Sequence, residues 1–112
     1  MRETFHLLPA EVWVATDPSE HYVAASLATE GFAHCTDGID ALGETFDRHY
    51  ALDPRAFVAL TLDLDALDAP WRYDDPGSPY PHIYGSIIPS AILGASRVER
   101  DQAGRFAGLA PE

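Results

Sequence analysis

The sequence is poor in positive charge, since it contains no lysine and sets seven arginines against 18 acidic residues. Its formal net charge is −11 at pH 7. A charge of this sign repels the phosphates of nucleic acids and the headgroups of anionic membranes. The sequence therefore predicts no bulk nucleic-acid binding and no membrane binding. It still leaves room for a few arginines gathered in one pocket.

The sequence has a single cysteine, Cys35, which excludes an internal disulfide framework and fits a reducing compartment. Cys35 follows His34 in a short strand-like segment, and neighbouring strand residues face opposite sides. If His34 faces a cleft, Cys35 faces the core, where a thiol is inert. No apolar run reaches the roughly 20 residues of a membrane helix, and the first residues lack a signal-peptide core. We therefore expect a soluble cytoplasmic protein.

Glycine-rich phosphate loops are also missing, because neither a P-loop nor a G-x-G-x-x-G stretch occurs.

The chain has 112 residues, of which 46% are hydrophobic, and is therefore long enough and apolar enough to form one hydrophobic core. We expect a single domain over residues 1–112 with its core at about residues 4–98. Residues 102–112 are rich in alanine and glycine, and we expect this tail to be partly mobile.

Short apolar segments predict about six strands, at residues 3–8, 32–35, 56–62, 70–73, 82–85 and 92–98. Residues 56–62 are almost continuously apolar, which indicates a strand covered on both faces. Apolar spacings of three and four predict a helix within residues 37–50, and a shorter helix is expected after Pro9. Early helices and late strands favour an α+β fold with small mixed, mostly antiparallel sheets and about two helices.

Residues 26–37 combine a polar turn, a short strand and a helix start. Gly31 suits the turn because glycine tolerates a positive φ. Thr36 or Asp37 suits the N-cap of the following helix. These assignments place His34 at a strand end beside a helix N-terminus, which is a favourable position for binding an anion.

Two segments are more specific: residues 26–36 (SLATEGFAHCT) and residues 81–85 (PHIYG), the latter followed by Ile88-Pro89. Together with Phe5-His6-Leu7 and Trp13, they resemble the domain of unknown function 952 family over about residues 4–98. The resemblance implies a compact fold similar to the ADP-ribosyltransferase superfamily, whose members hold NAD in a cleft between two small sheets. RNA 2′-phosphotransferases are relatives that use the same cleft for a phosphorylated RNA end.

The resemblance also implies roles for two residues, His6 and His34. His6, on the first strand, would hold one side of a nucleotide. His34, followed by Thr36, would orient its ribose or phosphate, and a His-x-Ser pattern of the phosphotransferases is similar to His34-Cys35-Thr36. The implied ligand is NAD, ADP-ribose or a related nucleotide.

One part of the superfamily pattern is missing. Its catalytic Glu lies on or before a late strand, whereas the nearest acids to His82 are Asp74 and Asp75. An oxocarbenium-like ribosyl centre needs a nearby carboxylate, so this departure argues against transferase chemistry. Glu30 is the only Glu of the central stretch and is the acid to test first.

The candidate catalytic residues are thus His34 and Glu30, and the candidate substrate-binding residues are His6, Ser26, Thr29, Thr36, His82 and Tyr84. His34 is also compatible with a buried imidazole bonded to a backbone carbonyl, His82 with anchoring the proline-rich loop, and His6 with a structural role. Ser26 and Thr29 are also compatible with closing a turn, and Tyr84 with packing. Arg72 and Arg97 are candidate phosphate ligands. His21 and His49 are interpreted as surface residues, and no ligand spacing predicts a metal site.

Three hypotheses follow from these residues. The first is a nucleotide-binding protein with an ADP-ribosyltransferase-like cleft, and transferase activity is left open. The second is an inactive protein-binding or regulatory module. The third is a small hydrolase or isomerase that uses His34 as a general base. The observation that separates the first two is whether His6, His34 and His82 meet at one concave, solvent-reached pocket.

Overall fold

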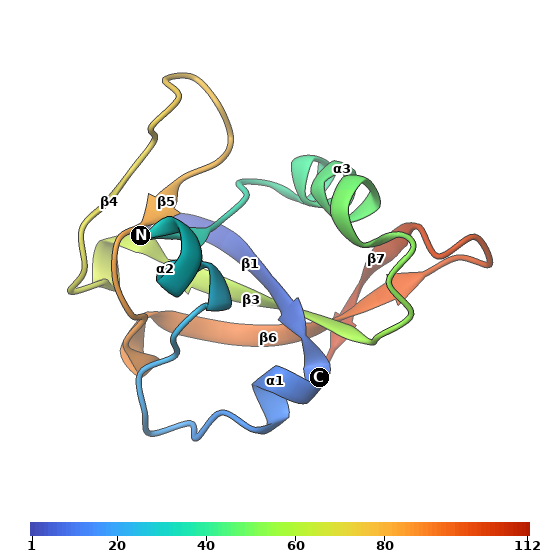
Figure 1. Cartoon of the computed structure of the whole chain (residues 1–112), viewed down its shortest axis with the longest axis horizontal. Helices are drawn as coiled ribbons and strands as arrows, with labels where there is room; N and C mark the ends of the chain where they lie inside the picture. The colour runs from blue at the N-terminus through green and yellow to red at the C-terminus, as the bar shows by residue number, and fades with distance from the viewer.

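A four-stranded antiparallel sheet runs through the centre of the fold (Figure 1). The computed structural model describes all residues from 1 to 112. The sheet contains β1 (Glu3–Pro9), β3 (Phe57–Asp63), β6 (Ile92–Arg100) and β7 (Phe106–Pro111), in the order β1-β3-β6-β7. β3 lies inside the sheet and four consecutive residues from Phe57 are buried, which confirms the prediction of a strand covered on both faces.

A second, smaller sheet contains β2 (Ala33–His34), β5 (His82–Ile83) and β4 (Trp71–Arg72), in the order β2-β5-β4. It is joined to the edge of the larger sheet just after β2. There the N–H of Phe5 donates to the carbonyl of Thr36 at 2.9 Å, and the N–H of Thr36 donates back at 2.8 Å. Beyond this bridge, the outer edge of β1 is not paired with another strand.

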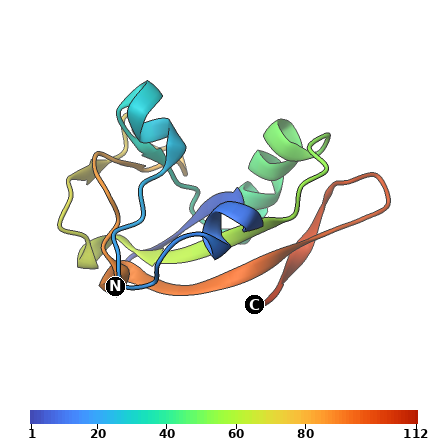
Figure 2. The same ribbon diagram turned by 60° about the horizontal axis from the view of Figure 1, so that its bottom comes forward.

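Three α-helices accompany the sheets: α1 (Ala10–Val14), α2 (Ala25–Glu30) and α3 (Ile39–Tyr50). Two 3-10 turns cover Leu64–Ala66 and Pro89–Ala91. α2 and α3 stand on the same side in Figure 2, with β1 between them. None of the helices combines the length and the apolar content that a membrane crossing requires.

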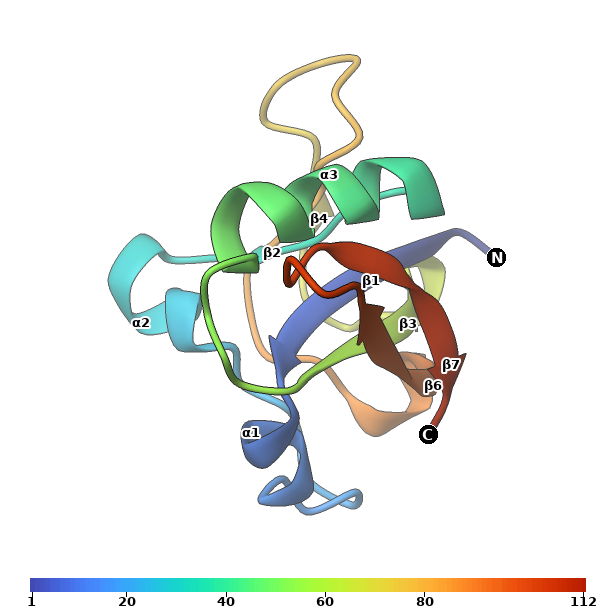
Figure 3. The ribbon, with the colours of Figure 1, turned by 90° about the vertical axis from the view of Figure 1, so that its right-hand side faces the viewer.

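Two apolar clusters hold these layers together, and β3 contributes to both because its side chains alternate. Val58, Leu60 and Leu62 face the cluster under the small sheet, where Ile83 and Cys35 are buried. Phe57 and Ala59 face the other cluster, under α3, which Figure 3 shows lying across the sheet. Its centre is Leu42 and Phe46, two α3 residues four apart and fully buried.

The α+β class and the antiparallel sheets agree with the sequence analysis, but two details differ. Every strand pair is antiparallel, so neither sheet is mixed. There are three helices instead of two, because the residues expected to form a turn before Gly31 form α2. Gly31 does take a positive φ of 87°, but as the left-handed residue that ends this helix.

The start of α3 was also predicted incorrectly. Gly38, with a φ of 84°, precedes the helix, and no side chain caps it, so neither Thr36 nor Asp37 is the N-cap. Thr36 is instead held by its backbone on the edge of β1.

The ordered structure extends past residue 98. Residues 106–111, expected in the tail, form β7 and pair with β6 from Ser96 to Arg100. The N–H of Phe106 also donates to the Asp47 carboxylate of α3 at 2.7 Å. Backbone pairing thus gives strand structure to a segment whose alanines and glycines carry little strand propensity.

Candidate functional site

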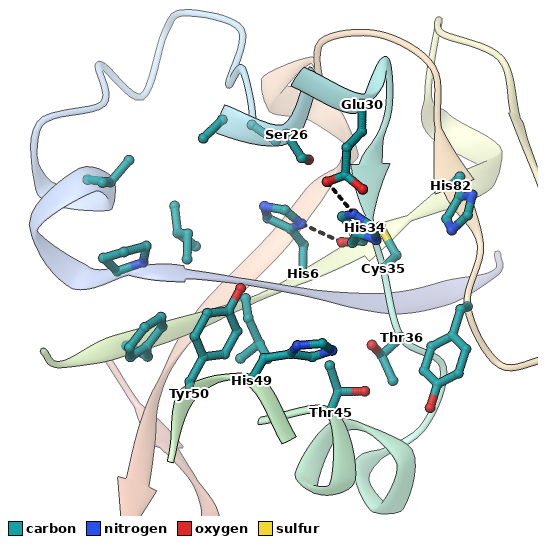
Figure 4. A pocket seen from close by; sticks show the side chains of 18 of the residues that line it. His6, Ser26, Glu30, His34, Cys35, Thr36, Thr45, His49, Tyr50 and His82 are labelled. Atoms are coloured by element: carbon teal, nitrogen blue, oxygen red, sulfur yellow. Dashed lines mark hydrogen bonds and ion pairs between the residues drawn. The ribbon is translucent and has the colours of Figure 1, made fainter. Parts of the chain in front are cut away.

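A cavity of about 900 Å³ lies along the open edge of β1 (Figure 4). α2, with Ser26 and Glu30, forms one wall, and α3, with Thr45 and His49, forms the opposite wall. The cavity is lined by His6, Leu7, Leu8, Pro9, Val12, Tyr22, Ala24, Ala25, Ser26, Thr29, Glu30, His34, Cys35, Thr36, Thr45, Arg48, His49, Tyr50, Arg55, Phe57, Tyr80 and His82. His6, His34 and His82 all line this concavity, and His6 is the buried member of the three.

The lining has the opposite charge balance from the chain as a whole. It contains four of the five histidines and two of the seven arginines, Arg48 and Arg55. Of the 18 acidic residues, only Glu30 lines the cavity. Walls that gather one sign of charge focus the field and attract an ion of the opposite sign. The cavity is thus suited to an anion on an otherwise strongly acidic protein.

His6 is a buried residue whose two ring nitrogens are both occupied. Nδ1 donates to the carbonyl oxygen of His34 at 2.6 Å, and Nε2 accepts from the Tyr22 hydroxyl at 2.9 Å. Burial lowers the pKa of His6 below its usual value of 6.5, which favours this neutral form. His6 therefore acts through His34, whose backbone it fixes, and has no free ring nitrogen for a ligand.

His34 is paired with the one cavity-lining acid. Its Nε2 lies 2.9 Å from a carboxylate oxygen of Glu30, which is the last residue of α2. The side chains are 55% and 49% exposed, so this ion pair is within reach of solvent. The two candidate catalytic residues are thus in direct contact.

His82 has a carboxylate partner of its own, Asp74 from the proline-rich loop. Nδ1 of His82 lies 2.7 Å from Asp74 Oδ2, and the hydroxyl of Tyr84 donates to the same oxygen. Nε of Arg72 donates to the other oxygen at 2.7 Å. Hydrogen bonds from Tyr84, Arg72 and His82 hold the pKa of the Asp74 carboxyl well below its usual range. Asp74 therefore stays ionised beside His82.

The wall formed by α3 carries polar groups that the protein itself leaves unsatisfied. Thr45, Arg48 and His49 follow a spacing of three and four, which places them on one helix face. The hydroxyl oxygen of Thr45 is buried and has no hydrogen-bond partner. The Arg48 side chain makes no ion pair, whereas Arg55 is bound to Asp53 at 2.7 Å. This face presents a free guanidinium beside an unpartnered hydroxyl.

Seven of the eight predicted site residues line the cavity, and Tyr84 is the exception. Tyr84 packs outside it, with the Arg72 guanidinium 4.1 Å from its ring centre. Ser26 and Thr29 do line the cavity, but their hydroxyls donate to the carbonyls of Phe32 and Ser26, which is the turn-closing role.

The predicted phosphate ligands are misplaced, since neither Arg72 nor Arg97 lines the cavity. Arg48 and Arg55 line it instead. His49 is exposed, as expected of a surface residue, and also lines the cavity. The polar face of the predicted helix was visible in the sequence. Nothing in the sequence showed that this face would meet α2 across the edge of β1.

Cys35 is buried, and burial raises the pKa of its thiol, so it is unsuited to nucleophilic attack. No group of three or more His, Cys, Asp or Glu side chains is placed to hold a metal ion. Acid–base groups and hydrogen-bond donors are therefore the chemistry that the lining offers.

Residues 7–95 match the family described as "Protein of unknown function (DUF952)". Among solved structures, the crystal structure of protein CC0527 from Caulobacter crescentus is similar, with a TM-score of 0.75 and 19% sequence identity. The similarity covers 94% of this chain and 93% of that chain. The solution NMR structure of CC0527 has a TM-score of 0.72 and 21% identity, covering 94% and 91%. At these identities the likeness shows the fold alone, and no curated protein matches the chain.

Proposed function

This chain belongs to the DUF952 family, whose description assigns no activity, and we propose from its cavity that it binds an anionic nucleotide. The supporting observation is the reversal of charge. In a chain of net charge −11, the free guanidinium of Arg48 and the guanidinium of Arg55, which is paired with Asp53, line one concavity whose only lining acid is Glu30. Local cations of this kind are what an acidic protein needs to overcome its own repulsion of a phosphate.

The α3 wall is the proposed phosphate-binding side. The free guanidinium of Arg48 offers a two-pronged donor to phosphate oxygens. The buried Thr45 hydroxyl, which has no partner in the protein and lines the same cavity, is the proposed second donor. Arg55, which is paired with Asp53, and His49 line the cavity nearby.

The remaining lining suits the rest of a nucleotide. Tyr50 and Tyr80, which are partly exposed, supply aromatic surface for a base or ribose. NAD, ADP-ribose and 2′-phosphorylated nucleotides are the proposed ligand class, in keeping with the resemblance to the ADP-ribosyltransferase-like fold. Glu30 is the one carboxylate available to stabilise a ribosyl centre, and its Oε2 is already paired with His34.

Calorimetric titration tests this proposal with ADP-ribose, NAD and 2′-phosphorylated adenosine, and with adenosine as the uncharged comparison. We expect a phosphorylated ligand to bind at least about 10-fold more tightly than adenosine, and binding to weaken as salt is raised. Arg48→Ala should lower the affinity about 10-fold or more, since a hydrogen bond to a charged group contributes about 1.5–3 kcal/mol.

Arg97→Ala is the matched control, because Arg97 is also exposed and makes no ion pair but lies outside the cavity. It should leave the affinity unchanged. Absence of heat with every phosphorylated ligand, on protein shown to be folded, would contradict nucleotide binding.

A second candidate is a module that binds a ligand without turnover and passes the signal to a protein partner. The observation that favours it is the lack of any cavity-lining acid besides Glu30. A ligand recovered unchanged after long incubation with the protein is its expected signature.

A further inference from the structure

We propose that the two imidazoles of His34 and His82 act together as acid and base in the hydrolysis of a cyclic phosphodiester on a nucleotide ribose. This activity rests on the proposed nucleotide binding and adds a reaction to it. It is carried by an arrangement that nucleotide binding alone does not need: two histidines from distant segments, paired side by side, each bound to its own carboxylate.

The pairing follows from the register of the small sheet. His34 on β2 is the direct cross-strand partner of His82 on β5, so both side chains project from the same face. Their ring centroids are 5.5 Å apart. Both residues line the cavity, so one bound group is able to reach both rings.

Each ring has one nitrogen committed to a carboxylate and one left for chemistry. Nδ1 of His82 is hydrogen-bonded to Asp74 Oδ2 at 2.7 Å, and Nε2 of His34 is hydrogen-bonded to Glu30 Oε2 at 2.9 Å. A carboxylate on one imidazole nitrogen fixes the orientation and tautomer of the ring. The free nitrogens are therefore Nε2 of His82 and Nδ1 of His34.

The surroundings hold the ring of His82 and the backbone of His34 in place. His82 is stacked on the ring of Phe32, with centroids 3.9 Å apart and planes inclined by 15°. The backbone of His34 is fixed by the hydrogen bond from His6 to its carbonyl oxygen. Asp74 is itself held by Arg72 and Tyr84. Such support is typical of side chains whose geometry matters to a reaction.

The proposed step is an in-line attack of water on phosphorus. Nε2 of His82, the less exposed ring, accepts a proton from the water as its oxygen bonds to phosphorus. The bond from phosphorus to one ribose oxygen breaks, and that oxygen takes a proton from Nδ1 of protonated His34. The product is a ribose phosphomonoester, and solvent returns both imidazoles to their starting states. A cyclic diester fits because its alkoxide leaving group needs an acid.

The test uses adenosine, guanosine, cytidine and uridine 2′,3′-cyclic monophosphates, with the phosphomonoester product followed by ³¹P NMR. The wild-type protein should hydrolyse at least one of them, with a bell-shaped dependence of kcat/KM on pH. His34→Ala and His82→Ala should each lower kcat by about 100-fold or more, the usual contribution of a positioned acid or base. The double variant should be little worse than either single variant, because the two act in one step.

His21→Ala is the matched control, since His21 is an exposed histidine that does not line the cavity, and it should leave kcat unchanged. Asp74→Asn tests a positioning role. It should lower kcat more than it changes KM. It should also shift the pH at which kcat/KM falls on the acidic side of the profile, which loss of a purely structural contact would not do.

Calorimetry on the same samples separates the two proposals. Binding of a cyclic nucleotide without turnover overturns the acid–base assignment and leaves nucleotide binding intact. Absence of turnover, together with absence of heat from the cyclic nucleotides, ADP-ribose, NAD and 2′-phosphorylated adenosine, overturns both. Turnover that survives the double variant also refutes the assignment, because the activity would then come from elsewhere.

Discussion

Tyr22→Phe removes one oxygen atom from the buried hydrogen-bond chain that fixes His34. The Tyr22 hydroxyl donates to Nε2 of His6, whose Nδ1 donates in turn to the carbonyl of His34. Tyr22 is 4% exposed and His6 is 6% exposed, so water has little access to the atoms left behind. The substitution changes almost no volume, which leaves the lost hydrogen bond as the main effect.

A buried acceptor left without its donor costs about 1–3 kcal/mol. At about 2.1 cal/mol/K per residue, the unfolding entropy of 112 residues is about 0.24 kcal/mol/K. We therefore expect Tm to fall by about 4–13 °C, with the smaller value for a single weak bond and the larger for a fully unsatisfied nitrogen.

The assay is thermal unfolding at pH 7.5, followed by circular dichroism and by calorimetry. Tyr80→Phe is the matched control, because the Tyr80 side chain also lines the cavity but its hydroxyl has no hydrogen-bond partner in the protein. It should change the unfolding free energy by less than about 0.5 kcal/mol. If Tyr22→Phe were as stable as Tyr80→Phe, the hydrogen-bond chain through His6 would not stabilise the fold.

Three further predictions concern stability. Burial lowers the pKa of His6 below 6.5, so below that pH the unfolded chain binds a proton more readily than the folded chain does. The free energy of unfolding should therefore be highest above pH 6.5 and fall as the pH is lowered. His6→Gln should reduce this fall, as measured by urea unfolding. Arg100 donates to four backbone carbonyls, including two at the end of α3. Arg100→Lys should lower the free energy of unfolding in urea by about 1–3 kcal/mol, because lysine lacks the guanidinium fork. Gly104 has a φ of 82°, and an added Cβ would lie 2.5 Å from the carbonyl oxygen of Ala51. Gly104→Ala should therefore lower the free energy of unfolding by about 1–3 kcal/mol. Gly94→Ala is the control and should lower it far less, because there is open space around Gly94.

Local patterns in the sequence were sufficient for the central strand and for the contrast between His34 and Cys35. Residues 57–60 are apolar at every position, and only a strand between two layers buries them all. The alternation of strand side chains correctly separates exposed His34 from buried Cys35. These features depend on sequence neighbours alone, which is why they were predictable.

Features that depend on tertiary placement were missed. β7 forms because its backbone completes the ladder of β6, although its alanines and glycines give no strand signal. Arg48 and His49 become site residues only because α3 lies across the edge of β1 from α2. The Asp74–His82 pair joins a loop to a strand. The two residues are eight apart in an irregular loop, so no periodic spacing predicts that their side chains are in contact.

Family resemblance located the histidines but not the charged wall. His6, His34 and His82 were named from motifs, and all three line the cavity. The resemblance named no arginine for the phosphate, and the arginines chosen for that role, Arg72 and Arg97, lie outside the cavity. Predicting a basic wall requires knowing which helix face meets the cavity, and helical spacing alone does not supply that information.

The central claim is that the cavity between α2 and α3 binds a nucleotide through its phosphates, and a crystal structure of the protein soaked with ADP-ribose tests it most directly. The account predicts a diphosphate against Arg48 and Thr45, with the ribose toward His34. An empty cavity at saturating ligand, or ADP-ribose bound on another face, would contradict it.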